Sequence, residues 1–180
     1  MHRLVANLLD ITRLESGSLK VAKEWVPMEE LVGSALVRLD AAAGRDIRVE
    51  LPPGLPLAHV DPVLFEQLMV NLLENALRHG ADPIEIKAWS TDTSLMLSIG
   101  DRGPGIPDGQ EERIFDKLVR GPESKGAGLG LAICRGIAEA HGGSIRASNR
   151  HHTGGAKFYV TLPLGQAPPP PPDEDNAMEG

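Results

Sequence analysis

Hydrophobic residues along the chain recur with two different spacings, and the spacings predict where helices and strands lie. A spacing of three or four residues, typical of a helix with one buried face, occupies residues 1–16, 28–43, 62–79 and 129–143. Short hydrophobic runs between turn signals predict strands at residues 19–26, 46–51, 57–60, 84–90, 94–100, 144–149 and 156–162. A shorter helix is expected at residues 111–118.

The ends of several helices carry signals of their own. Asp61 followed by Pro62 is typical of a helix start, because the carboxylate accepts hydrogen bonds from free N–H groups and proline fits the first turn. Glycine is typical of a helix end, which predicts stops at Gly17, Gly44 and Gly80. The helix between Asp61 and Gly80 therefore has a signal at each end.

The order of the elements predicts an α+β fold. Consecutive strands favour a mixed sheet over regular alternation of strand and helix, so we expect a two-layer α/β sandwich with about five strands and the helices on one face. This domain should span residues 20–164. The helix in residues 1–19 has a hydrophobic stripe without a partner nearby, so we expect it to pair with a missing segment or a second copy. Residues 165–180 are rich in proline and acidic side chains and are expected to be disordered.

Composition and charge narrow the classes of function. The 180 residues are 41% hydrophobic and only 3% aromatic, which predicts an aliphatic core. A net charge of −7 argues against nucleic acid as a partner, because phosphate backbones require a basic surface. No hydrophobic run approaches the roughly 20 residues that span a bilayer, so we expect a soluble, cytoplasmic chain without direct membrane insertion. The single cysteine, Cys134, lies among hydrophobic neighbours and should be buried.

A polar stripe runs along one of the predicted helices. In NLLENALRHG, Asn71 and Asn75 are one helical turn apart, and Arg78 and His79 continue the same edge. Leucine and alanine residues occupy the rest of the segment and should face a core. Two amides and two basic groups on one edge of a buried helix indicate a binding surface.

Two glycine-rich loops and a short basic segment are further candidates. The loop residues are Asp101, Gly103 and Gly105 in DRGPGIP, and Gly126, Gly128 and Gly130 in GAGLGLAI. Glycine allows close backbone approach, and free N–H groups at a helix start suit a phosphate, yet each pattern alone is also common in ordinary turns. Between the loops, IFDKLVRG places Lys117 and Arg120 after Phe115. These cations either bind phosphate or are solvated surface charges.

The order of these four segments is more specific than any one of them. NLLENALRHG, DRGPGIP, IFDKLVRG and GAGLGLAI match the N, G1, F and G2 boxes of sensor histidine kinases in sequence and spacing. The resemblance covers about residues 1–163 and includes HGGSI after the last box. Through NLLDITRLESG and the short linker before GAGLGLAICR, the chain is most similar to the potassium-responsive group of these kinases. The fold that this resemblance implies is the Bergerat-type ATP-binding sandwich.

The resemblance also implies roles for individual residues, with ATP or ADP and Mg²⁺ as ligands. Asp101 would accept a hydrogen bond from the adenine amino group, and Gly105 and Ile106 would shape the base pocket. Asn75 would bind Mg²⁺ through its side-chain oxygen, with Asn71 as a second candidate. The other implied ATP-binding residues are Arg78, His79, Gly103, Lys117, Arg120, Gly126, Gly128, Leu129 and Gly130. Residues 116–126 would form a lid over the nucleotide.

The chain departs from the family pattern in two places. Leu118 stands where a second aromatic residue is common. No histidine has the sequence context of the family's phosphoacceptor; the six are His2, His59, His79, His141, His151 and His152. We expect a structural role for His141, at a helix end where a cation is favoured. The first helix therefore resembles only the C-terminal half of the dimerisation hairpin.

For function, the resemblance implies the catalytic part of a protein histidine kinase. The complete enzyme would transfer the γ-phosphoryl group of ATP to a histidine outside this chain, and then to a response-regulator receiver domain. Similarity to the potassium-responsive group implies potassium or osmotic signalling by a membrane-bound sensor whose cytosolic part contains this chain. Residues 1–19 would provide a surface for self-association.

Three alternatives share the fold or the ligand. ATPases of the gyrase and heat-shock chaperone classes carry a glutamate one turn before the metal-binding asparagine, where this chain has Asn71, and a neutral amide cannot accept a proton from water. Serine kinases that restrain sigma factors lack the helix of residues 1–16. A nucleotide-sensing module without transfer activity is the third alternative.

Overall fold

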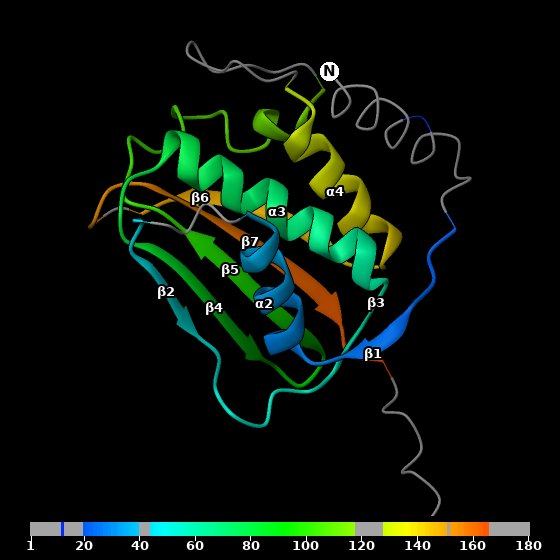
Figure 1. The fold of residues 1–180 in the computed structure, drawn as a ribbon. Coiled ribbons are helices and arrows are strands. Elements are labelled where there is room, and N and C mark those ends of the chain that lie inside the picture. Colours follow the sequence, from blue (N-terminus) through cyan, green and yellow to red (C-terminus); the bar gives the residue numbers. More distant parts are fainter. Residues whose placement is uncertain (1–11, 13–19, 40–43, 118–127, 151, 166–180) are drawn as a thin grey trace, which may run out of the picture.

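The computed structural model describes residues 12, 20–39, 44–117, 128–150 and 152–165. Figure 1 shows helices packed across the main sheet, with the short strands β1 and β3 beside it. The elements are β1 (Glu24–Val26), α2 (Met28–Leu39), β2 (Ile47–Glu50), β3 (Ala58–Val60), α3 (Pro62–His79), β4 (Ile84–Ser90), β5 (Ser94–Gly100), the 3₁₀ helix η1 (Arg113–Phe115), α4 (Gly130–Ala140), β6 (Ser144–Asn149) and β7 (Ala156–Pro163).

The sheet has five strands in the order β2-β4-β5-β7-β6. β2 runs parallel to β4, while the β4–β5, β5–β7 and β6–β7 pairs are antiparallel. β1 and β3 form a separate two-stranded antiparallel sheet. The expected mixed sheet of about five strands is confirmed.

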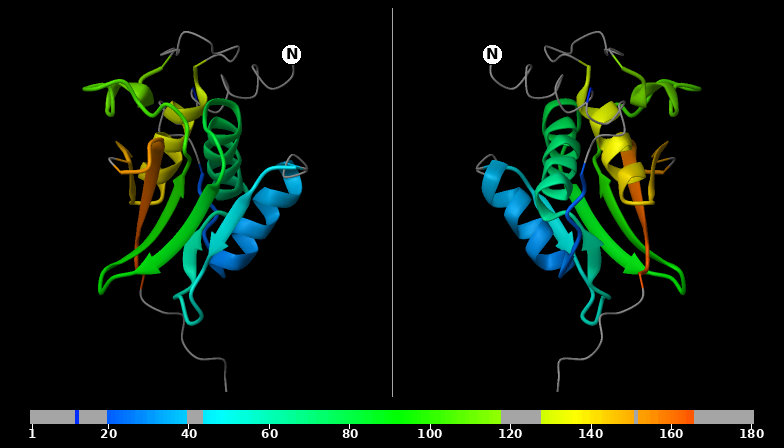
Figure 2. Two further views of the ribbon diagram at one scale, coloured as in Figure 1. Left: turned by 90° about the vertical axis from the view of Figure 1, so that its left-hand side faces the viewer. Right: turned by 90° about the vertical axis from the view of Figure 1, so that its right-hand side faces the viewer.

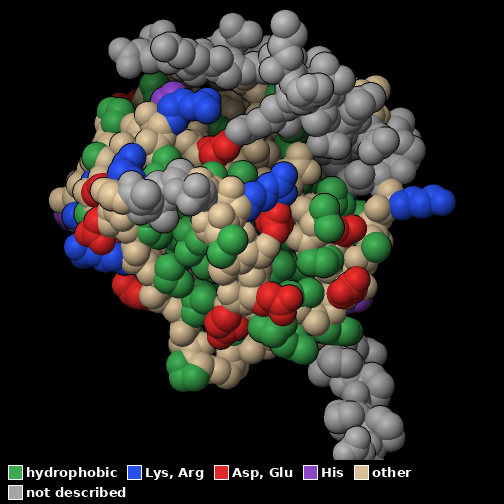
Figure 3. Space-filling view, in the orientation of Figure 1, with side chains coloured by type: hydrophobic (Ala, Val, Ile, Leu, Met, Phe, Trp, Pro, Cys, Tyr) green, Lys and Arg blue, Asp and Glu red, His purple; other side chains and the backbone are tan. Residues whose placement is uncertain are grey.

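The helices α2, α3 and α4 cover one face of the sheet, and the edge-on views of Figure 2 show the two layers. Alternation along the strands explains this arrangement, since Ile84, Ile86 and Ala88 of β4 are buried while Glu85 and Lys87 between them are half-buried. The residues buried beneath the helices are mostly aliphatic, as the composition predicts. Acidic, basic and hydrophobic side chains are interspersed on the helical side of the surface (Figure 3). No helix in the described part of the chain is long and apolar enough to cross a membrane.

Most predicted elements are confirmed, although β2, β3 and α4 are shorter than predicted and two further elements differ more. β4, β5 and β6 have the predicted bounds, and α3 begins after Asp61 and ends before Gly80. β1 is confined to Glu24–Val26, because the backbone N–H of Ala22 donates to the Asp61 carboxylate instead of a strand partner, at 3.0 Å. The helix predicted at 111–118 is only a 3₁₀ turn that ends where Asp116 becomes extended. Apart from Thr12, which is helical, the predicted helix at 1–16 lies outside the described residues, as does the tail at 166–180.

His141 ties the end of α4 to the start of α3. Its Nε2 accepts a hydrogen bond from the backbone N–H of Asp61 at 2.9 Å. Because that amide can only donate, Nε2 is unprotonated and Nδ1 carries the proton, which it donates to the Ile137 carbonyl at 2.7 Å. Burial lowers the pKa of His141, and the nearby Lys23 and His59 lower it further. The hydrogen bond to Ile137 and the charge of Asp61 raise it by less, so the pKa is lowered overall. The expected structural role is confirmed, but the expectation of a cation is wrong: the ring is neutral.

We expect acid to destabilise the fold through His141. The pKa of His141 in the folded protein lies below the ordinary histidine value of about 6.5, so the unfolded chain binds the extra proton first as the pH falls. Stability is therefore fully present above pH 6.5 and is lost as the pH falls toward the folded-state pKa. Urea unfolding at pH 7.5 and 5.5 measures this loss, at pH values above the ordinary range of carboxyl groups.

The variant His141→Leu should have a shallower pH dependence than the wild type between these two pH values. At pH 7.5 it should be less stable by about 1 to 3 kcal/mol, because the Asp61 N–H is left buried without an acceptor. His152→Gln is the matched control, since His152 is exposed in the hairpin after β6. An equal pH dependence in His141→Leu and wild type would contradict the assignment.

Candidate functional site

The polar stripe predicted along residues 71–79 lies on α3. Asn71 and Asn75 are half-buried, whereas Arg78 and His79 at the end of the helix are exposed. The opposite face of α3 is buried in the core through Phe65, Leu68, Met69, Leu72, Leu73 and Ala76. The helix therefore holds the two amides on a rigid, core-anchored element.

The beginning of α4 lies against this stripe. The Asn71 side-chain amide donates to the Gly130 carbonyl at 3.5 Å, and a Cβ on Gly130 would lie 3.8 Å from the Asn71 amide carbon. Leu129 is buried at the helix N-cap position and supplies no side-chain hydrogen bond to the cap, while Gly128 before it has a φ of +68°. The first N–H groups of α4 thus lack a side-chain acceptor at the cap, which suits an anion.

Asp101 follows directly after β5 and is 5% exposed. Both hydrogen bonds that the described residues make to its carboxylate go to Oδ1, from the N–H of Gly103 at 2.7 Å and of Ala156 at 3.4 Å. The loop after Asp101 packs on the C-terminal end of α3. A Cβ on Gly103 would lie only 2.7 Å from the His79 carbonyl oxygen, so a side chain there would push the loop away. The expected close backbone approach at this glycine is confirmed.

The far end of the same loop is attached to β6, through a contact that sequence analysis did not single out. The Asn149 side chain accepts from the Ile106 N–H and donates to the Ile106 carbonyl, both at 2.7 Å. Gly105 beside it has a φ of +81°. A polar residue at the end of a strand was the only local signal for Asn149, and such a signal is common to many turns.

Phe115 connects η1 to the core. It is 2% exposed, lies edge-to-face with Phe158 at 6.2 Å between ring centroids, and has the Arg135 guanidinium 4.7 Å from its own centroid. Arg135 also pairs with Glu112 at 2.8 Å, so this one side chain of α4 contacts residues at both ends of the turn. Lys117 is exposed after this turn. Leu118, Arg120 and Gly126, together with the rest of the lid predicted at 116–126, lie outside the described residues.

Two titratable groups beside the site have shifted pKa values. Burial raises the pKa of the Cys134 thiol well above its ordinary range, which confirms the expected buried cysteine. Burial opposes ionisation of Glu85, but the hydrogen bond and charge of Arg150, aided by Lys87 and Arg102, lower its pKa overall. Glu85 is thus a carboxylate under the loop, paired with Arg150 at 2.5 Å.

The described residues contain no cluster of three His, Cys, Asp or Glu side chains able to hold a metal. The donors at the site are instead the amide oxygens of Asn71 and Asn75, which suit a hard cation that takes its remaining ligands from phosphate and water. The residues present therefore fit Mg²⁺ only together with a nucleotide.

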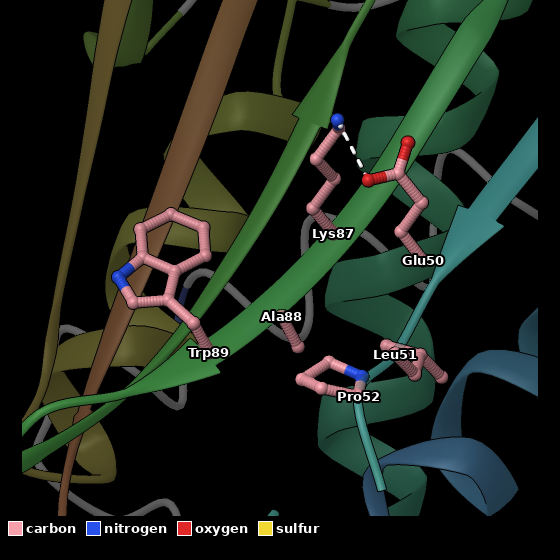
Figure 4. A pocket seen from close by; sticks show the side chains of 6 residues that line it. All are labelled: Glu50, Leu51, Pro52, Lys87, Ala88 and Trp89. Carbon is pink, nitrogen blue, oxygen red and sulfur yellow. Dashed lines mark ion pairs between the residues drawn. The ribbon is translucent and has the colours of Figure 1, made fainter.

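A surface hollow of about 490 Å³ lies apart from this site, lined by Glu50, Leu51, Pro52, Lys87, Ala88 and Trp89 (Figure 4). Lys87 and Glu50 pair across it at 2.8 Å. Trp89 pairs with Met96 in the sheet, whereas Asp101 follows Gly100 at the other end of β5. The hollow is therefore separate from the four motifs.

Comparison with known proteins agrees with this arrangement. The family model of histidine kinase-, DNA gyrase B- and HSP90-like ATPases matches residues 60–166. Sensor protein KdpD of Escherichia coli (strain K12) is 49% identical over 171 residues, which cover 92% of this chain and 19% of that protein. The signal transduction histidine-protein kinase AfsQ2 of Streptomyces coelicolor is 34% identical over 184 residues, covering 99% of this chain and 33% of that protein.

Among solved structures, full-length ShkA in complex with AMPPNP superposes with a TM-score of 0.80 at 27% identity, covering 94% of this chain and 37% of ShkA. The chain spans about a fifth to a third of the length of the two curated relatives. The expected resemblance to sensor histidine kinases, and among them to KdpD, is confirmed. The chain belongs to the family of histidine kinase-, DNA gyrase B- and HSP90-like ATPases and is the ATPase domain of a two-component sensor histidine kinase.

Proposed function

We propose that this chain binds ATP with Mg²⁺ and presents the γ-phosphoryl group to a histidine on a separate acceptor helix. The proposal rests on the contacts that the polar stripe of α3 makes with two other motifs, the loop after Asp101 and the start of α4. Asn71 contacts Gly130 at the start of α4, and Gly103 in the loop after Asp101 packs on the end of α3. These contacts support the proposal because they bring together three of the segments that carry the proposed ATP-binding residues.

The roles proposed for the residues follow from their chemistry. The carboxylate of Asp101 accepts from the adenine amino group, and Gly105 and Ile106 flank the base. The side-chain oxygen of Asn75 holds Mg²⁺, with Asn71 orienting its water ligands; the bound cation neutralises charge on the phosphates. The phosphates are held by the side chains of Arg78, His79, Lys117 and Arg120 and by the backbone of Gly126, Gly128, Leu129 and Gly130.

For the complete protein, we propose relay from the phosphorylated histidine to an aspartate of a response-regulator receiver domain. Membership of the sensor histidine kinases supports this partner, and the 49% identity to KdpD supports a role in potassium or osmotic signalling. Residues 1–19 are proposed to self-associate as half of a dimerisation hairpin. The remainder of such a sensor would be membrane-bound, with this part in the cytosol.

Incubation with labelled ATP tests the proposal. The chain alone should acquire no acid-labile, base-stable label, whereas a supplied acceptor-helix domain of a related histidine kinase should be labelled on histidine. Transfer requires an imidazole about 3 to 3.5 Å from the γ-phosphorus and in line with the leaving oxygen. His59 stacks on Trp25 with 4.4 Å between ring centroids, and His141 is buried in the contact with Asp61. Both imidazoles are therefore engaged elsewhere, and we expect neither to accept the phosphoryl group.

Three results would contradict the proposal. Label on this chain that disappears in His79→Gln or His2→Gln would mean that the acceptor lies within it. Steady ATP hydrolysis without label on the supplied domain would favour a gyrase-type ATPase, and nucleotide binding with neither activity would favour a sensing module.

A further inference from the structure

Asn149, the last residue of β6, makes a two-point contact with the loop that follows β5. Its Oδ1 accepts from the Ile106 N–H and its Nδ2 donates to the Ile106 carbonyl, each at 2.7 Å. The backbone N–H can only donate and the carbonyl can only accept, so the orientation of the amide is fixed by its partners. A residue 43 positions away thus satisfies both backbone groups of Ile106.

Arg150, the next residue, supports the opposite end of the same loop. Its guanidinium donates to the Asp101 carbonyl at 3.5 Å and pairs with Glu85 of β4 at 2.5 Å. The hairpin beyond it closes through Arg150 N–H to the Gly155 carbonyl at 2.9 Å. A Cβ on Gly155 would come within 2.0 Å of the Asp101 carbonyl oxygen, so this hairpin lies directly against Asp101.

The loop needs such support because of its glycines. Asp101 is held by its backbone bond to Ala156 at 2.9 Å, next to the β5–β7 ladder, but Ile106 lies five residues beyond and outside any strand. Gly103 and Gly105 between them are conformationally free in an unconstrained chain. Ordering a flexible loop on binding weakens affinity, so a loop that is ordered beforehand binds more tightly.

We propose that Asn149 and Arg150 are positioning residues that hold the loop 101–106 in the conformation that receives adenine. The inference rests on the proposed role of this loop in nucleotide binding. Asn149 acts through Ile106 and Arg150 through Asp101, and neither side chain contacts the base. Gly105 is part of the same device, since a Cβ there would lie 2.6 Å from Asn149 Oδ1 and displace the amide.

Two substitutions at Asn149 distinguish the effect of its hydrogen bonds to Ile106 from the effect of its side-chain shape. Asn149→Ala removes both hydrogen bonds and should weaken ATP binding about 10-fold in calorimetry. Asn149→Asp keeps the shape and one acceptor but places an oxygen against the Ile106 carbonyl, so it should weaken binding at least as much. Arg146→Ala is the control, because Arg146 is exposed on the same strand and three residues away, on the opposite face of the sheet. It should leave affinity unchanged.

Amide hydrogen exchange supplies a readout that requires no nucleotide. In both Asn149 variants the Ile106 amide should lose protection by at least about 10-fold, while protection in the β5–β7 ladder is retained. If the wild-type protein fails to bind ATP, the proposed function is wrong. The exchange result still decides whether Asn149 holds the loop 101–106 in place. Asn149→Ser, which keeps a short polar side chain, replaces Asn149→Ala if the latter does not fold. Unchanged Ile106 protection, or ATP affinity within twofold of wild type in folded variants, would overturn the proposal.

Discussion

Replacing Asn75 with alanine is expected to reduce phosphoryl transfer to a supplied acceptor domain by about 100-fold or more. ATP binding should weaken far less, by under about tenfold. Asn75 is half-buried on α3, which is anchored in the core and capped at its start by Asp61, so its amide is held in place. The contacts proposed for the base, at Asp101 and Ile106, do not involve this amide, and affinity from the base should survive.

The measurement compares the initial rate of transfer with the dissociation constant for ATP, each across a series of Mg²⁺ concentrations. Val63→Ala serves as the control on the same helix, because Val63 is 71% exposed in the first turn and far along the helix from Asn75. A fall in binding and transfer by the same factor would make Asn75 a general binding residue. The metal assignment would then be wrong.

Sequence predicts this fold well where the signals are local. Asp61 and Pro62 define the start of α3 within a single turn, and the structure shows the carboxylate accepting from the Val63 and Leu64 N–H groups at 3.1 Å. Gly80 ends the helix, and its amide bonds to the Ala76 carbonyl. Each of these contacts joins residues at most four positions apart, so the sequence contains all the information they need.

The contacts that sequence missed join residues far apart. Asn149 and Ile106 are separated by 43 positions, and His141 and the Asp61 N–H by 80. The neutral state of His141 follows from that distant N–H and from burial, whereas its place at a helix end predicts a cation. Nothing in the local sequence carries the order of strands in the sheet, which brings β6 and its Asn149 beside β7.

The candidate site shows the same division. The residue types and their spacing single out Asn71, Asn75 and Asp101 as candidates, because chemistry at a binding site limits which side chains are usable. The hydrogen bonds that hold these residues in place were not predictable. Many different backbone or side-chain groups, far away in the sequence, can supply the same hydrogen bond. Arg150 illustrates this, since it follows β6 and pairs with Glu85 of β4. That pairing depends on the start of β4 and the end of β6 lying at the same end of the sheet.

Replacing Asp101 with asparagine is expected to weaken ATP binding by about 1.5 to 3 kcal/mol, the range for hydrogen bonds to charged groups. That corresponds to roughly a 10- to 150-fold rise in the dissociation constant. Asparagine has the same shape and can still accept from the Gly103 N–H through its oxygen. Its NH₂ group would then face the adenine amino group, and two donors would oppose each other; turning the amide around would instead leave the Gly103 N–H facing a donor. Either orientation loses one hydrogen bond.

The same variant should change the choice of base, which makes the test independent of overall affinity. Guanine carries a carbonyl oxygen where adenine carries its amino group, so an asparagine NH₂ can donate to it, whereas the wild-type carboxylate repels it. The ratio of GTP to ATP dissociation constants should therefore fall by about tenfold or more in Asp101→Asn. Calorimetry with both nucleotides, after circular dichroism has shown a native fold, measures the ratio. An unchanged ratio together with unchanged ATP affinity would remove Asp101 from the base pocket. A loss of affinity for both nucleotides by the same factor would assign it to the loop's structure instead, because a distorted loop weakens every base alike.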